Sequence, residues 1–204
     1  MRGAVALVLE VVFFVLAFGV RSWVQWRRTG SSGVILPRRG APVVERVGAS
    51  AFVLAMVLMV AAPIADLSGA ARVAALDGAW SAIVGGVVVS AGVILCFVAQ
   101  LTMGDAWRIG VDVDERTDLV TNGVFASIRN PIFSAMLVAV VGLVLLVPNL
   151  WATGALVVLV IGLELQVRFV EEPYLERVHG DVYRTYADRA GRFVPGLGHQ
   201  RPTR

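Results

Sequence analysis

Residues 131–167 read PIFSAMLVAVVGLVLLVPNLWATGALVVLVIGLELQV. The stretch holds two apolar runs, Pro131–Val147 and Leu150–Val167, which are separated only by Pro148 and Asn149. Each run approaches the ~20 apolar residues with which a helix crosses the hydrocarbon core of a bilayer. So short a connection leaves the second helix no place except alongside the first, and the pair is predicted to form an antiparallel hairpin.

Three further apolar blocks precede the hairpin, and we expect Pro63 and Asp66 to close the second of them: Ala4–Val20, Val47–Ile64 and Trp80–Met103. The chain is 57% hydrophobic and 16% charged, whereas soluble domains are about 45–50% apolar and about 25% charged. Its apolar residues form long blocks and not amphipathic stripes, which favours membrane spans over a soluble core. We therefore predict an all-α polytopic membrane protein with about five transmembrane helices.

The arginines predict an orientation in the membrane. Only Arg2 precedes the first block, and no small-residue cleavage site follows it, so we interpret this block as a retained helix and not a signal peptide. The connections at 21–46 and 104–130 and the tail from Arg168 carry most of the arginines. By the positive-inside rule, the amino terminus lies outside and the carboxy terminus in the cytoplasm, in a cell inner membrane. The polar segment 104–130 and the tail then share one side of the membrane.

Several functional classes are excluded by what the chain contains. One cysteine, Cys96, and two histidines, His179 and His199, supply neither a disulfide framework nor a metal site. No glycine-rich dinucleotide or P-loop motif is present, so a soluble nucleotide-binding fold is not supported. The basic charge is expected to contact membrane lipids, and no nucleic-acid-binding motif accompanies it. Any cofactor is expected to bind between helix ends and loops.

Ionisable residues cluster where the last apolar run ends. Helical spacing predicts Glu164, Arg168, Glu171 and Glu172 on neighbouring turns of one face. The alternative is an ordinary helix end with a Glu164–Arg168 ion pair at the membrane boundary. The position of Glu164 argues against an ordinary helix end, because a carboxylate one turn inside a span needs a partner or an aqueous cavity.

Two further motifs have both a structural and a functional interpretation. Asn130 suits a helix N-cap and Pro131 a first helical turn, but neither role explains Arg129, which would bind an anion at that helix terminus. Trp107-Arg108 is either an interfacial anchor or part of a site.

The order of these motifs resembles the isoprenylcysteine carboxyl methyltransferase family, and phospholipid methyltransferases share the pattern. The resemblance covers about Gly104–Pro195 and is carried by these residues: Gly104-x-x-Trp107-Arg108, Gly123-Val124-Phe125, Arg129-Asn130-Pro131-Ile132-Phe133, Arg168-x-x-Glu171-Glu172-x-x-Leu175, Gly180-x-x-Tyr183-x-x-Tyr186 and Arg192-Phe193-x-Pro195. It divides the chain into three amino-terminal helices with a basic loop (1–103) and a catalytic half with an amphipathic interfacial helix and tail (104–204).

The resemblance implies an S-adenosylmethionine site at the cytoplasmic face. Its cofactor pocket would be formed by Gly123, Phe125, Arg129, Asn130, Pro131, Phe133, Glu171, Tyr183 and Tyr186, with Trp107, Arg108 and Glu164 nearby. Arg168 and Glu172 would be the catalytic residues. The family usually has His at position 130 and Tyr at position 133, so a histidine base at position 130 is absent here.

The implied reaction is methyl transfer to a lipophilic, isoprenoid-like or lipid-like acceptor that reaches the site from the bilayer. We predict a carboxylate acceptor oriented by Arg168, whereas an amine or hydroxyl acceptor would need a base such as Glu172. The alternatives are an NADPH-dependent membrane reductase of the sterol-reductase type and a non-enzymatic helical membrane protein. The sequence leaves the acceptor and the oligomeric state open.

Overall fold

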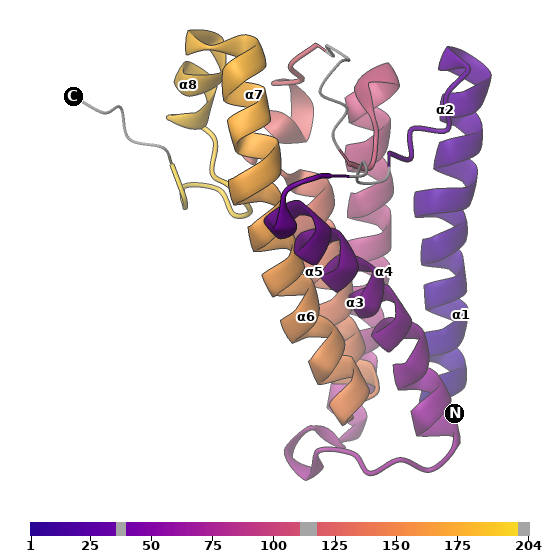
Figure 1. Cartoon of the computed structure of the whole chain (residues 1–204). Helices are drawn as coiled ribbons and strands as arrows, with labels where there is room; N and C mark the ends of the chain where they lie inside the picture. Colours follow the sequence, from indigo (N-terminus) through magenta and orange to yellow (C-terminus); the bar gives the residue numbers. More distant parts are fainter. Residues whose placement is uncertain (36–39, 111–117, 200–204) are drawn as a thin grey trace.

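The computed structural model describes residues 1–35, 40–110 and 118–199, and the regular structure of these residues is helical throughout (Figure 1). The α-helices are α1 (Arg2–Phe14), α2 (Arg21–Thr29), α3 (Val43–Leu67), α4 (Ala79–Met103), α5 (Pro131–Leu146), α6 (Leu150–Gln166), α7 (Glu172–His179) and α8 (Asp181–Ala187). Two π-helical segments, η1 (Val15–Val20) and η5 (Val167–Glu171), join α1 to α2 and α6 to α7. Short 3₁₀ turns are η2 (Ala74–Leu76), η3 (Gly104–Ala106) and η4 (Gly123–Ala126).

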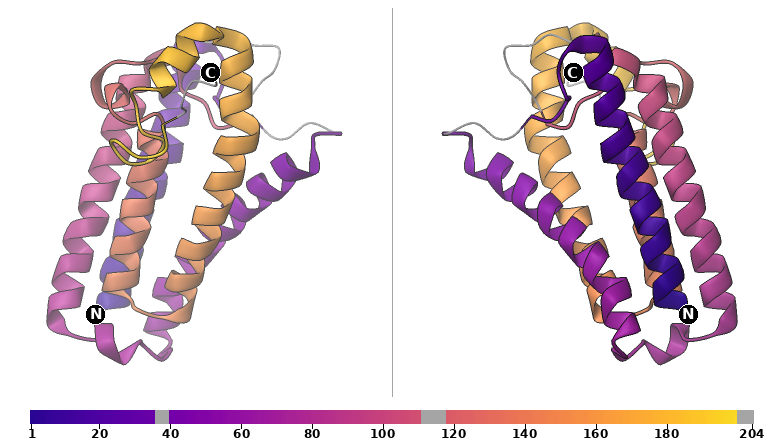
Figure 2. Two further views of the ribbon diagram at one scale, coloured as in Figure 1. Left: turned by 90° about the vertical axis from the view of Figure 1, so that its left-hand side faces the viewer. Right: turned by 90° about the vertical axis from the view of Figure 1, so that its right-hand side faces the viewer.

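The helix lengths confirm a polytopic membrane protein. Four helices of the described chain are long and apolar enough to cross a bilayer: Arg2–Thr29, Val43–Leu67, Ala79–Ala106 and Leu150–His179. The fifth apolar helix, α5, is shorter at 16 residues. We call the end of the bundle that carries α2, η3, α7 and α8 the site end, and the opposite end, with Met1 and the 68–78 loop, the closed end (Figure 2).

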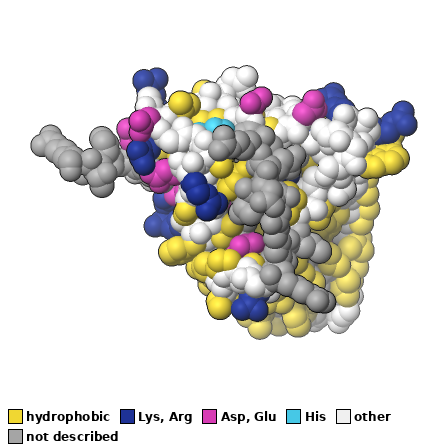
Figure 3. Space-filling model, turned by 45° about the horizontal axis from the view of Figure 1, so that its top comes forward, with side chains coloured by type: hydrophobic (Ala, Val, Ile, Leu, Met, Phe, Trp, Pro, Cys, Tyr) yellow, Lys and Arg dark blue, Asp and Glu magenta, His cyan; other side chains and the backbone are white. Residues whose placement is uncertain are grey.

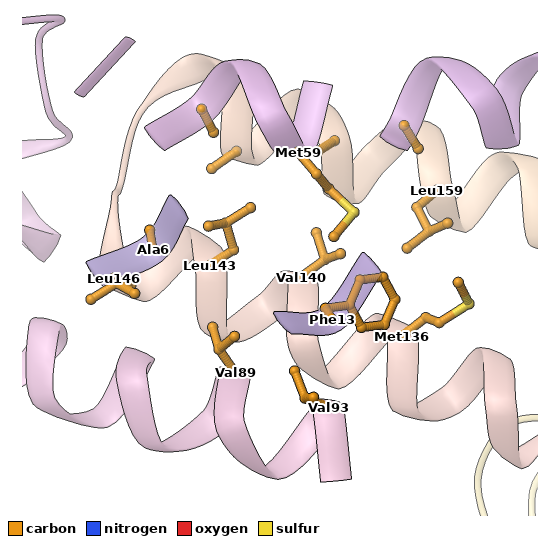
Figure 4. Close-up of a cluster of buried hydrophobic side chains, with 14 of the residues drawn as sticks. Ala6, Phe13, Met59, Val89, Val93, Met136, Val140, Leu143, Leu146 and Leu159 are labelled. Atoms are coloured by element: carbon orange, nitrogen blue, oxygen red, sulfur yellow. The ribbon is translucent and has the colours of Figure 1, made fainter. Parts of the chain in front are cut away.

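Small residues bring the hairpin helices against their neighbours. A Cβ on Gly85 of α4 would clash with the backbone of Leu146, and one on Gly142 of α5 with the backbone of Val89. Backbones therefore touch along α4 and α5, as small residues allow in membrane helices. Larger side chains fill the remaining core, where Phe13 of α1 lies among Met136 and Val140 of α5 (Figure 4).

The expected end of the second apolar block is wrong. Helix α3 runs through Pro63 to Leu67 and does not stop at the proline. Its last turn is held because Asp66 accepts hydrogen bonds from the Gly3 backbone N–H (2.9 Å) and from Arg72 (2.6 Å). A proline is tolerated within a membrane helix where neighbouring groups secure the surrounding turns.

The π-helical segments change the direction in which later side chains point. A π turn holds one extra residue, and each residue of a helix accounts for about 100° of rotation. In η1 the Arg21 N–H bonds to the Leu16 carbonyl, five residues back, which leaves the Ala17 carbonyl to accept from Gln100 Nε2 at 3.0 Å. In η5 the same kind of turn lies immediately before Glu172.

Candidate functional site

A cavity lies inside the site end, below a rim on which charged side chains gather above hydrophobic flanks (Figure 3). It encloses about 890 Å³, counting its open mouth. The chain segments that line it are far apart in the sequence, from α1 to α7. Its lining residues are Phe18, Phe52, Gln100, Met103, Trp107, Arg108, Ile109, Gly110, Phe125, Arg129, Asn130, Pro131, Ile132, Phe133, Met136, Glu171, Tyr174 and Leu175. We call this the main cavity.

The amino terminus of α5 opens into the main cavity. Pro131 occupies the first helical turn and Asn130 the N-cap position, as the sequence predicts. The Asn130 side chain, however, makes no capping bond; its Nδ2 donates to the Arg192 carbonyl at 3.1 Å. Asn130 therefore ties the tail to the helix start, and the first turn of α5, whose Ile132 and Phe133 line the cavity, has no side-chain cap from it.

Arg129 and Glu172 form the centre of a buried ion cluster. Arg129 Nη2 donates to Glu172 Oε1 at 2.7 Å, and Arg192 donates to both Glu172 oxygens at 2.8 Å. Arg129 Nη1 also donates to the carbonyls of Ala187, the last residue of α8, and Ala190, just beyond it. The hydrogen bond with Glu172 raises the pKa of Arg192. This cluster fastens the end of α8 and the tail to the start of α5 and to α7.

Glu171 and Arg108 are the charged groups that line the main cavity outside this cluster. Arg108 Nη2 donates to the Tyr174 hydroxyl at 3.2 Å, and its guanidinium lies 5.7 Å from the Tyr174 ring centroid. Glu171 is the last residue of η5 and lines the cavity from that position. The cavity therefore offers one cation and one carboxylate among aromatic side chains.

The predicted single face of Glu164, Arg168, Glu171 and Glu172 is wrong. Glu164 and Arg168 form an exposed ion pair, whereas Glu172 is buried and Glu171 lines the cavity. The extra residue of the π turn in η5 is the physical reason, because it rotates Glu171 and Glu172 relative to Glu164 and Arg168. Arg168 does not belong to the lining of the main cavity.

The remaining predicted residues surround the cavity at different depths. Phe125 lines it, and its carbonyl accepts from the Tyr186 hydroxyl at 2.7 Å. Tyr183 is buried behind Tyr186, with ring centroids 6.3 Å apart. Burial raises the pKa of Tyr186 to about 12 and that of Tyr183 as well, so both hydroxyls stay protonated. Gly123, with φ of 56°, begins the turn that presents Phe125.

Trp107 is a wall of the cavity and not an interfacial anchor, since its side chain is 2% exposed. Arg21 stacks on it with its guanidinium carbon 4.7 Å from the ring centroid and donates to the Gly104 carbonyl. One turn later, Gln25 Nε2 donates to the Asp105 carbonyl at 2.7 Å. The first helix thus holds the turn that carries Trp107.

Sequence reasoning did not include the contributions of the first three long helices, namely Phe18, Phe52, Gln100 and Met103. Gln100 carried a usable signal, because a polar side chain within a span needs a partner. The apolar residues carried none, since they look like any other lipid-facing or core residue of a membrane helix.

Comparison with known proteins identifies the class of this chain. A model of the phospholipid methyltransferase family matches residues 80–182, half of the chain, and the chain belongs to this family. No curated protein matches the sequence.

Among solved structures, the fold is similar to that of the eukaryotic intramembrane Ras methyltransferase, an isoprenylcysteine carboxyl methyltransferase, with a TM-score of 0.64 and 21% identity. The likeness covers 95% of this chain and 66% of that one, so this chain spans just under two thirds of its length. At this identity the likeness establishes the fold.

Proposed function

We propose that this protein transfers a methyl group from S-adenosylmethionine to a lipophilic acceptor at one face of the membrane. The observation that carries the proposal is the main cavity, where residues of the matched family region converge at the start of α5. We place this site end in the cytoplasm, because the arginine-bearing connections meet there.

The side chains of the main cavity fit the chemistry of the donor. S-adenosylmethionine supplies an electrophilic methyl group on a sulfonium and carries a carboxylate, an ammonium group and an adenine ring. Arg108 and the helix terminus suit the carboxylate, and Glu171 suits the ammonium group. Aromatic side chains such as Phe125 and Tyr174 suit the adenine and the sulfonium. Arg129 Nε, buried at the cavity wall, has no hydrogen-bond partner within the described part of the chain.

The buried ion cluster is proposed to position the site and not to react. Both Glu172 oxygens and both Arg129 Nη atoms are occupied by the tail and by each other. Their role is to keep α8 over the cavity and water out of it. Glu171, which faces the cavity, then replaces Glu172 as the carboxylate nearest the reacting atoms.

Donor binding tests the proposal directly. The full chain in phosphatidylcholine nanodiscs should bind tritiated S-adenosylmethionine and S-adenosylhomocysteine in equilibrium dialysis. Arg108→Met and Glu171→Gln should each weaken binding about ten-fold, since each removes a charge-assisted partner. Arg184→Met, an exposed arginine paired with Glu176 and Asp181, is the matched control and should leave binding unchanged.

Two results would contradict the proposal. The first is binding of NADPH without binding of S-adenosylhomocysteine, which favours the reductase class. The second is an unchanged affinity in both cavity variants, which places the donor elsewhere.

A further inference from the structure

A second cavity adjoins the main cavity through a shared wall. Both are lined by Phe52, Ile109, Gly110, Phe133 and Glu171. The rest of the second cavity comes from α3, α6 and the Val34–Ile35 segment, and it encloses about 710 Å³, counting its opening. A molecule in the second cavity would therefore meet a molecule in the main cavity beside Glu171.

The second cavity opens on the flank of the bundle. Helices α3 and α6 cross closely where a Cβ on Gly162 would lie 3.1 Å from the Phe52 backbone nitrogen. The helices are still close at Gly48, where a Cβ would lie 3.4 Å from the Gln166 backbone nitrogen, and beyond that point α3 leans away from α6 towards its own start (Figure 2). Val53, which lines this cavity, is 60% exposed on that flank. An alkyl chain dissolved in the bilayer has a direct lateral path into such an opening.

The polar groups of the second cavity are acidic. Among the described residues that line it, the charged side chains are Glu45, at the start of α3, and Glu171, and the remaining polar side chain is the amide of Gln166. A carboxylate or phosphate placed here would be repelled by two carboxylates in a half-buried setting, although Arg108 offsets part of the Glu171 charge from the main cavity. A protonated amine would be attracted by both.

We propose that the second cavity binds the acceptor of the reaction, and that this acceptor is a lipophilic amine without an anionic group. Its alkyl part lies between α3 and α6, and its nitrogen lies between Glu45 and Glu171. The inference rests on the proposed methyl transfer, and it names the substrate class for the same site.

The acidic groups suit both binding and reaction. The amine binds as an ammonium ion and loses a proton to a carboxylate before it reacts. Its nitrogen lone pair then forms a bond to the donor's methyl carbon as the carbon–sulfur bond breaks, and the electron pair of that bond stays on sulfur. The methylated nitrogen is positively charged and is stabilised by the carboxylate that has not taken the proton.

This assignment differs from the carboxylate acceptor that the sequence predicts. That prediction relied on Arg168 to orient the carboxylate, but Arg168 is half exposed, is paired with Glu164 and lines neither cavity. Arg168 is therefore turned away, Arg108 lines only the main cavity, and the charged side chains that the described residues offer to the second cavity are two carboxylates.

Photo-crosslinking tests the acceptor class without any methyl donor. The full chain in phosphatidylcholine nanodiscs is labelled with tetradecylamine that carries a chain diazirine, and in parallel with the matched tetradecanoic acid. We expect the amine to label α3 and α6 around Phe52, Val53 and Leu163, with competition by unlabelled tetradecylamine. The acid should label these positions at least about ten-fold less.

Variants separate charge recognition from general lipid binding. Glu45→Gln should lower specific amine labelling about ten-fold and leave S-adenosylhomocysteine affinity unchanged, because Glu45 lines only the second cavity. Glu45→Lys should shift labelling from the amine towards the acid. Glu176→Gln, an exposed acidic residue of α7, is the matched control.

Several outcomes would overturn the inference. These are labelling by the acid equal to that by the amine, amine labelling that survives Glu45→Gln, and competition by phosphatidylethanolamine as strong as that by tetradecylamine. If S-adenosylhomocysteine binds while the amine does not label the cavity, the acceptor class is wrong and the proposed methyl transfer stands. If S-adenosylhomocysteine fails to bind, the proposed function itself is wrong.

Discussion

The two ends of the bundle treat buried polar groups in opposite ways. At the closed end Asp66 accepts hydrogen bonds from the Gly3 N–H and from Arg72, and Asp77 accepts from both Arg2 and Arg72. At the site end Arg21 is 2% exposed, yet its Nε and Nη1 have no partner within residues 1–35, 40–110 and 118–199. Among the described residues, pairing is complete at the closed end and incomplete beside the cavity, and both oxygens of the buried Glu10, within α1, also have no partner.

This difference in pairing indicates which part of the molecule lowers the free energy of unfolding. A buried polar group without a partner costs about 1–3 kcal/mol, so such groups persist mainly where they serve another purpose. Gln25 Oε1 and Gln100 Oε1 are also buried and unpartnered in the described structure, and both residues contact the segments that shape the main cavity. Apart from Glu10, the unpartnered groups of the described chain thus lie at the site end, where we propose that the donor binds.

The largest effect is expected from breaking the ion cluster that closes the site end. Glu172→Gln removes the charge that compensates Arg129, whose side chain is 2% exposed. Loss of one partner of a buried ion pair costs about 3–5 kcal/mol, and α8 should detach from the cavity. Thermal unfolding in detergent should show a large drop, and S-adenosylhomocysteine binding should be lost. Glu176→Gln, one turn along α7, should change neither measurement. Equal effects in the two variants would show that the buried ion cluster has no special role in closing the site end.

A smaller effect, confined to stability, is expected at the closed end. Asp66→Asn keeps an acceptor for the Gly3 N–H but loses the ion pair with Arg72, whose side chain is 29% exposed and can be solvated. The loss should be about 1–2 kcal/mol in thermal unfolding. The affinity for S-adenosylhomocysteine should equal that of the wild type. A weaker affinity would show that the two ends are coupled and that the contrast between them is false.

The smallest change in stability is expected for Arg21→Met, although binding should suffer. The substitution removes the stack on Trp107 and the bond to the Gly104 carbonyl, but it also removes an unpaired buried charge. These contributions oppose each other, so unfolding should shift by less than about 1 kcal/mol. S-adenosylhomocysteine affinity should fall about five-fold as Trp107 loses its support. Arg27→Met, on the exposed side of the same helix, provides the comparison, and an equal affinity in both variants would refute a role for Arg21.

Most of the fold was predictable because membrane insertion depends on local composition. The apolar runs on either side of Pro148 and Asn149 form the expected hairpin, with Asn149 capping α6 through Ala152 N at 3.0 Å. Pro63 misled the prediction, because its cost was judged from the isolated chain. Asp66, Gly3 and Arg72 hold the helix beyond it through contacts that only the folded protein contains.

The candidate site was predictable only in part. The region around Arg129 and Pro131 was found because a helix start beside an arginine has a recognisable pattern, and Arg108 and Glu171 were named without their geometry. The register change in η5 has no sequence signature, so Glu171 and Glu172 could not be assigned to cavity and ion cluster. Phe18 lines the main cavity, Glu45 lines the second cavity and Phe52 lines both. Tertiary packing brings them there, and hydropathy does not encode it.

The π-helical segments separate two properties that a hydropathy profile treats as one: insertion of the helix into the membrane and the direction in which its side chains point at the site. If Val15–Val20 formed a regular α-helix, the span would still hold its 28 residues, so membrane insertion would proceed as before. Without the π turn to take up the extra residue, Arg21 and Gln25 would point about 100° away from the Trp107 turn. A chain can therefore be correctly inserted, with the right number of spans and the right orientation, and still lack its site. Topology and assembly of the cavity are encoded by different features of the same helix, and they can change independently during evolution.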